Sequence, residues 1–73
     1  MKLTELDFGK TATVVAVKEG ERVTKRLMEM GIVPGVKIKV IKSAPFGDPL
    51  EIRLLGYNLA VRKNEAEVIE VED

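Results

Sequence analysis

The stretch RLMEMGIVPGVKIKVIKSAPFGDP, residues 26–49, contains the end of a helical pattern, a strand pattern and two rigid turns. The helical pattern arises because Val23, Leu27 and Met30 recur at intervals of four and three residues and therefore share one face. It predicts a short amphipathic helix over residues 22–30, with Met30 buried on the apolar face. The period then changes to the alternation of a β-strand, so we expect the helix to lie between two strands.

The first turn, between the helix and the next strand, has a mechanical explanation. Gly31 follows the last periodic residue, where a left-handed C-cap favours glycine. Pro34 restricts φ to about −65° and suits position i+1 of a type II turn, and Gly35 supplies the positive φ required at i+2. We expect this corner to set the register of the following strand, and Pro34 to be available to a partner.

The second turn, residues 44–49, is longer than a hairpin requires and has a phenylalanine near its centre. Its two prolines stiffen the chain, which lowers the entropy lost when a partner binds. Phe46 either covers one end of the fold or is an exposed anchor, and the sequence leaves both interpretations open. The partner contacts predicted in this loop are Pro45, Phe46, Asp48 and Pro49.

The remaining sequence predicts short strands separated by turns. The expected strands are residues 10–18, 36–41, 50–55, 59–63 and 68–71, which are rich in β-branched residues or alternate in polarity. Turns are expected at Glu19-Gly20-Glu21 and at Gly56-Tyr57-Asn58, and a single helical turn at residues 64–66.

Five short antiparallel strands favour a closed barrel, because closure removes sheet edges that 73 residues could not otherwise cover. We therefore predict one mainly β domain over residues 1–73. It is a small five-stranded SH3-like barrel with one short α-helix between strands 1 and 2, packed against an open end.

The composition argues against an enzyme. The chain has no cysteine and no histidine, which removes disulfides, thiolate metal sites and the commonest general base. The single serine, Ser43, has no histidine to activate it. We expect no catalytic residue, no cofactor and no metal site, and we interpret the acidic residues at 64–73 mainly as a solvated tail. We also expect a cytoplasmic location without membrane insertion, because the sequence has no signal peptide and no long apolar run.

The net charge of zero is the sum of unlike parts. Residues 22–63 hold nine Lys or Arg and three acids, residues 64–73 hold five acids and no base, and residues 1–21 hold three Lys and four acids. Either these parts neutralise each other locally, or the basic part forms a face for an acidic partner. The cations that could bind nucleic acid are Lys37, Lys39, Lys42, Arg53, Arg62 and Lys63. Because only three aromatic residues are available for stacking, we do not expect a nucleic acid partner.

The predicted partner-binding surface also includes residues outside the two turns. Met28 lies off the apolar helix face and is the better contact candidate, and Leu27 adjoins it. Arg62 adds a positive charge. Four glycines are expected to act only in turns: Gly31, Gly35, Gly47 and Gly56.

An ordered set of residues at fixed spacings runs through residues 26–66. Its members are Leu27, Met30-Gly31-Ile32, Pro34-Gly35, Pro45, Gly47-Asp48-Pro49, Ile52, Gly56, Leu59-Ala60-Val61-Arg62 and Glu65-Ala66. Together with Leu3, Leu6 and Gly9, this set resembles the FeoA family of small cytosolic proteins of bacterial ferrous iron transport. The sequence departs from the family at Val61, where Leu is common.

The resemblance implies an SH3-like barrel with an inserted helical segment. It also implies an accessory role toward FeoB, a membrane transporter with a cytosolic G-protein domain. The same module forms the C-terminal domain of DtxR-type iron-dependent repressors.

Two functions therefore need to be distinguished. The favoured one is an accessory protein that contacts the cytosolic parts of the FeoB transporter and does not hold iron itself, because histidine and cysteine ligands are absent. The alternative is an SH3-like module that binds nucleic acid or associates with itself. The sequence does not distinguish whether an accessory would stimulate the G-protein activity, gate the pore or stabilise the complex.

Overall fold

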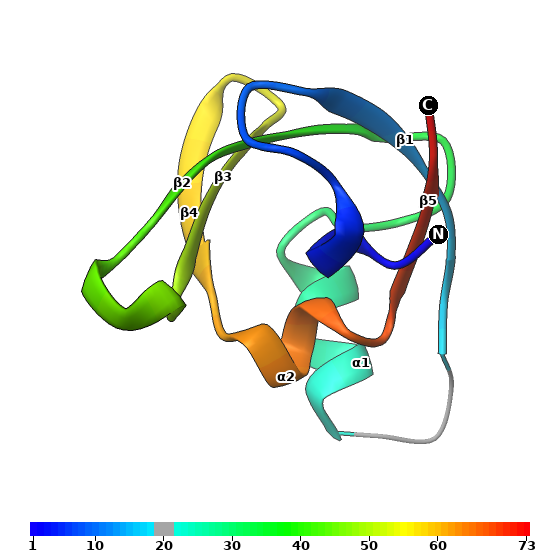
Figure 1. The fold of residues 1–73 in the computed structure, drawn as a ribbon. Helices are drawn as coiled ribbons and strands as arrows, with labels where there is room; N and C mark the ends of the chain where they lie inside the picture. Colours follow the sequence, from blue (N-terminus) through cyan, green and yellow to red (C-terminus); the bar gives the residue numbers. More distant parts are fainter. Residues whose placement is uncertain (19–21) are drawn as a thin grey trace.

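The computed structural model describes residues 1–18 and 22–73, so the turn expected at residues 19–21 lies outside the described residues (Figure 1). In chain order the described elements are η1 (Leu3–Glu5), β1 (Thr11–Val17), α1 (Arg22–Glu29), β2 (Lys37–Ser43), η2 (Pro45–Gly47), β3 (Leu50–Leu54), β4 (Tyr57–Val61), α2 (Lys63–Ala66) and β5 (Ile69–Glu72).

The five strands form one antiparallel sheet in the order β4-β3-β2-β1-β5. The register shifts between Val14 and Ala16 in β1, and again between Val40 and Lys42 in β2. Such irregularities increase the twist and bend the strand. The sheet consequently curls, and α2 joins its two outer strands across the lower end (Figure 1). The predicted fold class, mainly β with one helix between the first two strands, is confirmed.

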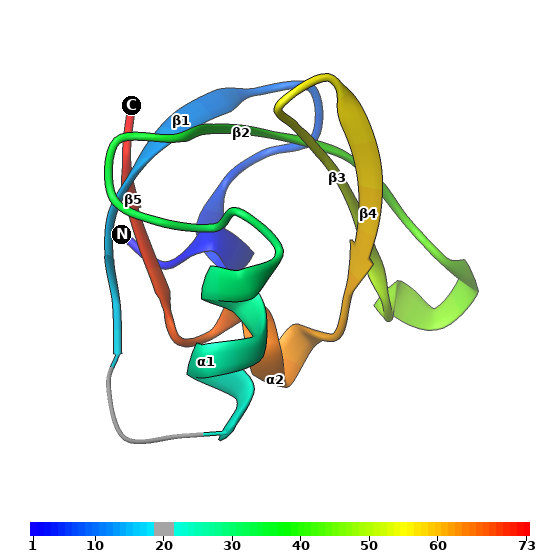
Figure 2. The ribbon, with the colours of Figure 1, turned by 180° about the vertical axis from the view of Figure 1, so that it is seen from behind.

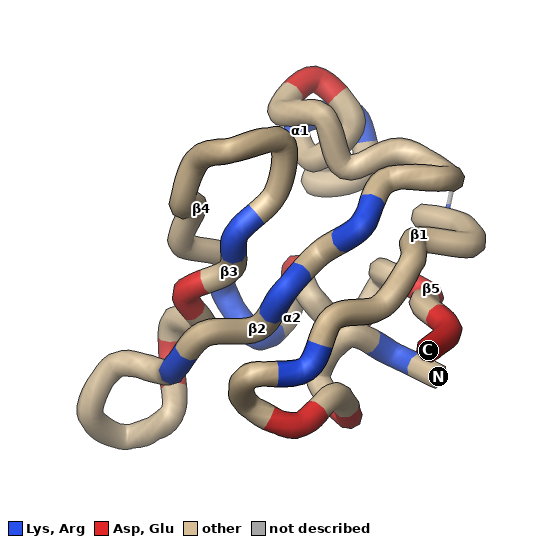
Figure 3. The backbone as a smooth tube through the Cα atoms, turned by 90° about the horizontal axis from the view of Figure 1, so that it is seen from above, with Lys and Arg blue, Asp and Glu red and all other residues tan. Residues whose placement is uncertain are grey.

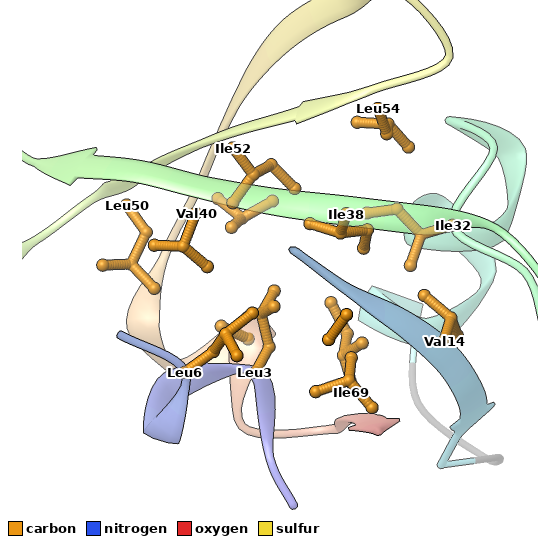
Figure 4. Close-up of a cluster of buried hydrophobic side chains, with 14 of the residues drawn as sticks. Leu3, Leu6, Val14, Ile32, Ile38, Val40, Leu50, Ile52, Leu54 and Ile69 are labelled. Atoms are coloured by element: carbon orange, nitrogen blue, oxygen red, sulfur yellow. The ribbon is translucent and has the colours of Figure 1, made fainter. Parts of the chain in front are cut away.

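The interior of the curled sheet holds a single apolar cluster (Figure 4). Ile38 and Val40 of β2 point inward and are buried, while Lys37 and Lys39 between and beside them are exposed, as the alternation predicts. Leu3 of η1 is fully buried against the same cluster, so the segment before β1 contributes to the core.

Both α-helices lie at one end of the barrel, and the middle of β2 crosses the other end (Figure 2). Leu27 of α1 is fully buried, and the Thr24 hydroxyl donates a hydrogen bond to the Lys18 carbonyl at the end of β1. Arg26 Nη1 lies 2.8 Å from Glu65 Oε2, which joins α1 to α2. The helix therefore closes the barrel end through its apolar stripe and one ion pair.

The acidic residues at 64–73 belong to folded elements, as the predicted helical turn and last strand require, and only the first of them, Glu65, is buried. Residues 64–73 form most of α2 and the strand β5, which pairs with β1. The side chain of Glu65 is 4% exposed, and its Oε1 accepts a hydrogen bond from the Arg62 amide at 2.8 Å. The interpretation as solvated acids therefore holds for Glu67, Glu72 and Asp73, but it is wrong for Glu65, which caps α2.

The β3–β4 hairpin also differs from the prediction. Its turn consists of Leu55 and Gly56, with φ of 50° and 84°, as a two-residue type I′ turn requires. Tyr57 and Asn58 already belong to β4, and the Asn58 side chain accepts a hydrogen bond from Arg53 Nη1 at 2.9 Å. The turn expected at Gly56-Tyr57-Asn58 is therefore wrong in position, because cross-strand pairing holds Asn58 in the strand.

Candidate functional site

The corner between α1 and β2 has the structural role that the sequence predicts. The Gly31 amide donates to the Met28 carbonyl at 3.0 Å and the Ile32 amide to the Leu27 carbonyl at 3.1 Å, which is the pattern of a Schellman motif. Gly31 has φ of 98°. Leu27 and Ile32 are both fully buried, so they form the apolar contact that accompanies this motif. The helix thus ends where glycine permits it.

The turn that follows is the predicted one around Pro34. The Val36 amide donates to the Val33 carbonyl at 3.2 Å, and Gly35 has φ of 96°, as position i+2 of a type II turn requires. The Gly35 amide then donates to the Val14 carbonyl at 2.8 Å. This bond aligns the start of β2 with β1, while Pro34 stays exposed.

The loop between β2 and β3, residues 44–49, projects from the barrel and is called here the Phe46 loop (Figure 2). Phe46 has φ of 73°, a left-handed conformation that is unfavourable by about 1 kcal/mol for a residue with a side chain. Its side chain is fully exposed. The interpretation of Phe46 as a cover for the barrel end is therefore wrong, and the exposed arrangement is the one observed.

The Phe46 loop, which contains a cis peptide bond between Asp48 and Pro49, is held by its own backbone and by α2. The Gly47 amide donates to the Ala44 carbonyl at 2.9 Å, and the Ala44 amide to the Pro49 carbonyl at 2.9 Å. Asp48 Oδ1 accepts a hydrogen bond from the Lys63 amide at 3.0 Å. These hydrogen bonds give Phe46 a fixed base.

An open pocket of about 240 Å³ adjoins the base of the Phe46 loop. Its lining consists of Lys42, Ser43, Ala44, Pro45, Pro49, Glu51 and Ala60. Pro45 and Pro49 therefore line a recess beside the exposed phenylalanine, an arrangement in which an apolar side chain of a partner could be received.

A second apolar surface, the helix-end patch, consists of Met28, Leu55 and Tyr57, which are 45%, 67% and 40% exposed. Leu55 Cδ1 lies only 2.7 Å from the position that a Cβ of Gly31 would occupy, and the Tyr57 hydroxyl donates to the Met30 carbonyl. Met28 lies one turn before Gly31 and therefore on the same side of α1. The hairpin turn and the end of α1 thus gather these three side chains.

The structure divides the predicted partner-binding residues into separate groups. Pro45, Phe46, Asp48 and Pro49 share the Phe46 loop, and Arg62 is next to Lys63, which bonds that loop. Met28 belongs to the helix-end patch, at the other end of β3. Pro34 lies at the other end of β2, roughly 20 Å of strand away from the loop.

Leu27 is a correction to the predicted surface. It is fully buried beneath α1, because the C-cap directs it against Ile32, and a partner cannot touch it in this conformation. Met30, expected to be buried, is partly buried against the core. Met28, the residue preferred for contact, is exposed.

Leu55 and Tyr57 are surface residues that the sequence reasoning did not select. The available signal was the pair Leu54-Leu55, because an alternating strand has an inward position for only one of two adjacent leucines. Leu54 is buried, and Leu55 is turned outward at positive φ.

Within residues 1–18 and 22–73, no cluster of three or more carboxylates is arranged to hold a metal ion. In the same part of the chain, no helix has the length and apolar character needed to cross a membrane.

Comparison with known proteins gives a consistent result. The FeoA domain family matches residues 1–73. The chain is 42% identical over 72 residues to the Fe(2+) transport protein A/Fe(2+) transporter FeoB fusion protein of Porphyromonas gingivalis, covering 99% of the chain but only 8% of that relative.

Solved structures match along almost the whole chain. The FeoA protein of Chlorobium tepidum has a TM-score of 0.89 at 47% identity, covering 99% of this chain and 69% of that one. FeoA of Stenotrophomonas maltophilia, an SH3 domain protein solved in complex with zinc, has a TM-score of 0.87 at 29% identity, covering 99% and 89%. The SH3-like class predicted for the barrel is thereby confirmed.

A manganese-dependent transcriptional repressor shares the fold alone, with a TM-score of 0.88 at 16% identity over 40% of its length. This agrees with the expectation that repressors contain the same module. The family match over residues 1–73 and the identity to the fusion protein show that this chain belongs to the FeoA domain family.

Proposed function

We propose that the protein is a non-catalytic accessory of ferrous iron transport that contacts the cytosolic part of a FeoB-type transporter. The relative from Porphyromonas gingivalis supports this partner, because its name assigns an iron transport protein A and the FeoB transporter to one fused chain. This chain corresponds to only 8% of that relative. The proposal therefore assigns the transport activity to the FeoB-type transporter and not to this chain.

The observation that best supports a role in protein contact is the backbone conformation and exposure of Phe46. Its backbone is in a left-handed conformation and its side chain is fully exposed, so no contact within the described chain offsets the conformational free energy. Exposed aromatic residues on preorganised loops are frequent anchors of protein interfaces. The recess beside Phe46, lined by Pro45 and Pro49, adds a place for an apolar group of the partner.

The helix-end patch is the second part of the proposed contact. Leu55 is also left-handed and mostly exposed, and it is the only one of its three members with positive φ. The two surfaces lie at opposite ends of β3, so one partner would have to extend along the barrel to reach both. Each surface can therefore be tested separately.

Iron itself is assigned to the transporter in this proposal. Fe²⁺ sites in proteins commonly include histidine, and this chain has neither histidine nor cysteine. The accessory would then act by binding to the protein that carries the ion.

The test is a pull-down of the purified chain against the cytosolic part of a FeoB-type transporter. We expect the wild type to bind, and Phe46→Gly and Leu55→Asn each to weaken binding by roughly tenfold or more, as loss of an anchor does. Glycine and asparagine tolerate positive φ, so both variants should remain folded. Val15→Thr is the control, because Val15 is a half-exposed apolar residue (48%) on β1 that belongs to neither surface.

The outcomes separate the parts of the proposal. If only one variant loses binding to the transporter, the contact is assigned to the surface that contains the changed residue. If both variants bind normally, neither surface contacts the transporter. Absence of binding by the wild type contradicts the accessory function.

A further inference from the structure

The outer face of β2 and β3 carries a group of exposed cations. Lys37 and Lys39 are exposed, and Arg53 of β3 lies directly opposite Lys39 in the strand register. Like charges directly opposite each other destabilise a sheet. Among the described residues, none of these three cations belongs to an ion pair. The opposition of Lys39 and Arg53 is therefore unfavourable in charge, and a ligand of negative charge would relieve their repulsion.

The strand register extends this feature across four strands. Thr11 of β1 lies opposite Lys39, and Asn58 of β4 lies opposite Arg53. The resulting cationic row, Thr11-Lys39-Arg53-Asn58, presents a hydroxyl, an ammonium and a guanidinium group. Arg53 is oriented by hydrogen bonds to Asn58 Oδ1 and to the Gly56 carbonyl, and the Asn58 amide in turn donates to the Glu51 carboxylate beside the row. The hydroxyl, the ammonium and the guanidinium are donor groups that bind phosphate oxygens.

Further positive charge flanks the row. Seen from above, Lys and Arg positions follow β2 and continue onto β3, whereas acidic positions lie beside β5, near the N-terminal segment, on α1 and along β3 toward the Phe46 loop (Figure 3). Lys10 is the residue before β1, and its carbonyl accepts a hydrogen bond from the Val40 amide, which holds it beside β2. The zero net charge of the chain is therefore unevenly distributed, with cations concentrated along β2.

We propose that the cationic row binds the phosphate headgroups of an anionic lipid bilayer. The row lies on the convex outside of a curled sheet, and none of its four residues lines the open pocket at the base of the Phe46 loop. A charged planar surface can contact such a face without shape complementarity. Basic residues near an anionic leaflet are attracted to it. This orientation would leave the two helices on the side away from the lipid.

The inference rests on the proposed function, because a transporter partner brings the module next to a bilayer. Contact with the transporter raises the effective concentration of lipid at the row, so weak intrinsic binding is sufficient. Nucleic acid fits the same row less well, because none of its four residues offers an aromatic ring on which a base could stack.

The test is co-sedimentation of the full chain with vesicles, measured without the transporter. We expect binding to vesicles of equal parts phosphatidylcholine and phosphatidylglycerol at low ionic strength, little binding to phosphatidylcholine alone, and weakening as salt increases. Lys37→Glu combined with Lys39→Glu should reduce binding about thirtyfold or more. The control, Arg22→Glu with Lys25→Glu, makes the same change in net charge on α1 and should retain most of the binding.

Several results would overturn the inference. They are equal binding to both kinds of vesicle, an equal loss in the α1 control, or no binding by a wild type whose circular dichroism shows it folded. Tighter binding of a DNA duplex with the same dependence on Lys37 and Lys39 would assign the row to nucleic acid. Because the transporter pull-down uses no lipid and these measurements use no transporter, failure of one proposal is distinguishable from failure of the other.

Discussion

Gly31 and Leu55 show how one contact links the end of α1 to the β3–β4 hairpin. Both residues have positive φ, 98° for Gly31 and 50° for Leu55, and the leucine side chain lies against the glycine. A Cβ at Gly31 would lie 2.7 Å from Leu55 Cδ1, which is too close for ordinary packing. Glycine is therefore required at this position for conformation and for space.

This geometry predicts that Gly31→Ala lowers the free energy of unfolding by about 2 kcal/mol, of which about 1 kcal/mol comes from the left-handed backbone. Adding Leu55→Ala should recover the part due to the close contact and leave the backbone part. Urea unfolding of both single variants and the double variant measures these terms. Strictly additive effects would show that the contact contributes nothing.

The residue scale also shows where sequence reasoning succeeds. The turn positions of Gly31 and Gly35 are predictable because only glycine takes positive φ readily, so the residue type reports the backbone. Leu55 is not predictable in the same way, since leucine disfavours this conformation and adopts it only because the hairpin pairing and the nearby Gly31 hold it there. A residue whose backbone conformation is unfavourable for its side chain can be identified only from the structure.

At the scale of elements, α1 is attached to the barrel by three polar contacts besides its apolar stripe. Thr24 bonds the end of β1, Tyr57 bonds the Met30 carbonyl after the helix, and Arg26 pairs with Glu65. Thr24 and Glu65 are both buried, but Glu65 alone serves two of these partners, the Arg62 amide and the Arg26 side chain. Loss of the Glu65 side chain would therefore leave two polar groups, the Arg62 amide and the Arg26 guanidinium, without these partners.

We expect Glu65→Ala to lower the free energy of unfolding by about 2 kcal/mol, because it removes the cap of α2 and the ion pair to α1. Glu65→Gln should be milder, about 1 kcal/mol, because its amide oxygen can still accept from the Arg62 amide. Arg26→Ala removes only the ion pair and is the matched comparison. Thermal and denaturant unfolding would contradict this assignment if alanine and glutamine at position 65 had equal effects.

The elements themselves are largely predictable from the sequence. The alternation around Ile38 and Ile52 identifies β2 and β3, because a period of two places apolar side chains on one face of a strand and on no single face of a helix. The burial of Glu65 is not predictable, since it depends on α1 lying beside α2. For the candidate site, the sequence leaves Phe46 open between a cover and an anchor, and only the fold shows that it is exposed. The sequence also gives no sign that the length of β2 separates Pro34 from the Phe46 loop.

At the scale of the molecule, residues from the beginning of the chain close the sheet. The Met1 amino group and carbonyl bond the carbonyl and amide of Val71, and Lys2 forms a bridge with Glu70 of β5. Lys2 Nζ lies 3.1 Å from Glu67 Oε2. This hydrogen bond, together with the negative charge of Glu67, raises the pKa of Lys2 above its usual value of 10.5.

The raised pKa of Lys2 predicts a stability contribution with a defined dependence on pH. A raised pKa means that the folded state holds the proton more tightly than the unfolded state, so the contribution is fully present below the unfolded pKa, near 10.5. It is lost as pH rises through the folded value. The wild type should therefore exceed Lys2→Gln in stability by a small, constant amount at neutral and mildly alkaline pH. That difference should shrink above about pH 10.5.

The Glu67→Gln background is the control for this pH dependence. There the lysine has lost its main partner, so replacing Lys2 should have much less effect at any pH. Denaturant unfolding of the four chains across this range tests the coupling. A difference that stays constant through the alkaline limb would show that the Lys2–Glu67 contact does not connect the first residues to the segment between α2 and β5.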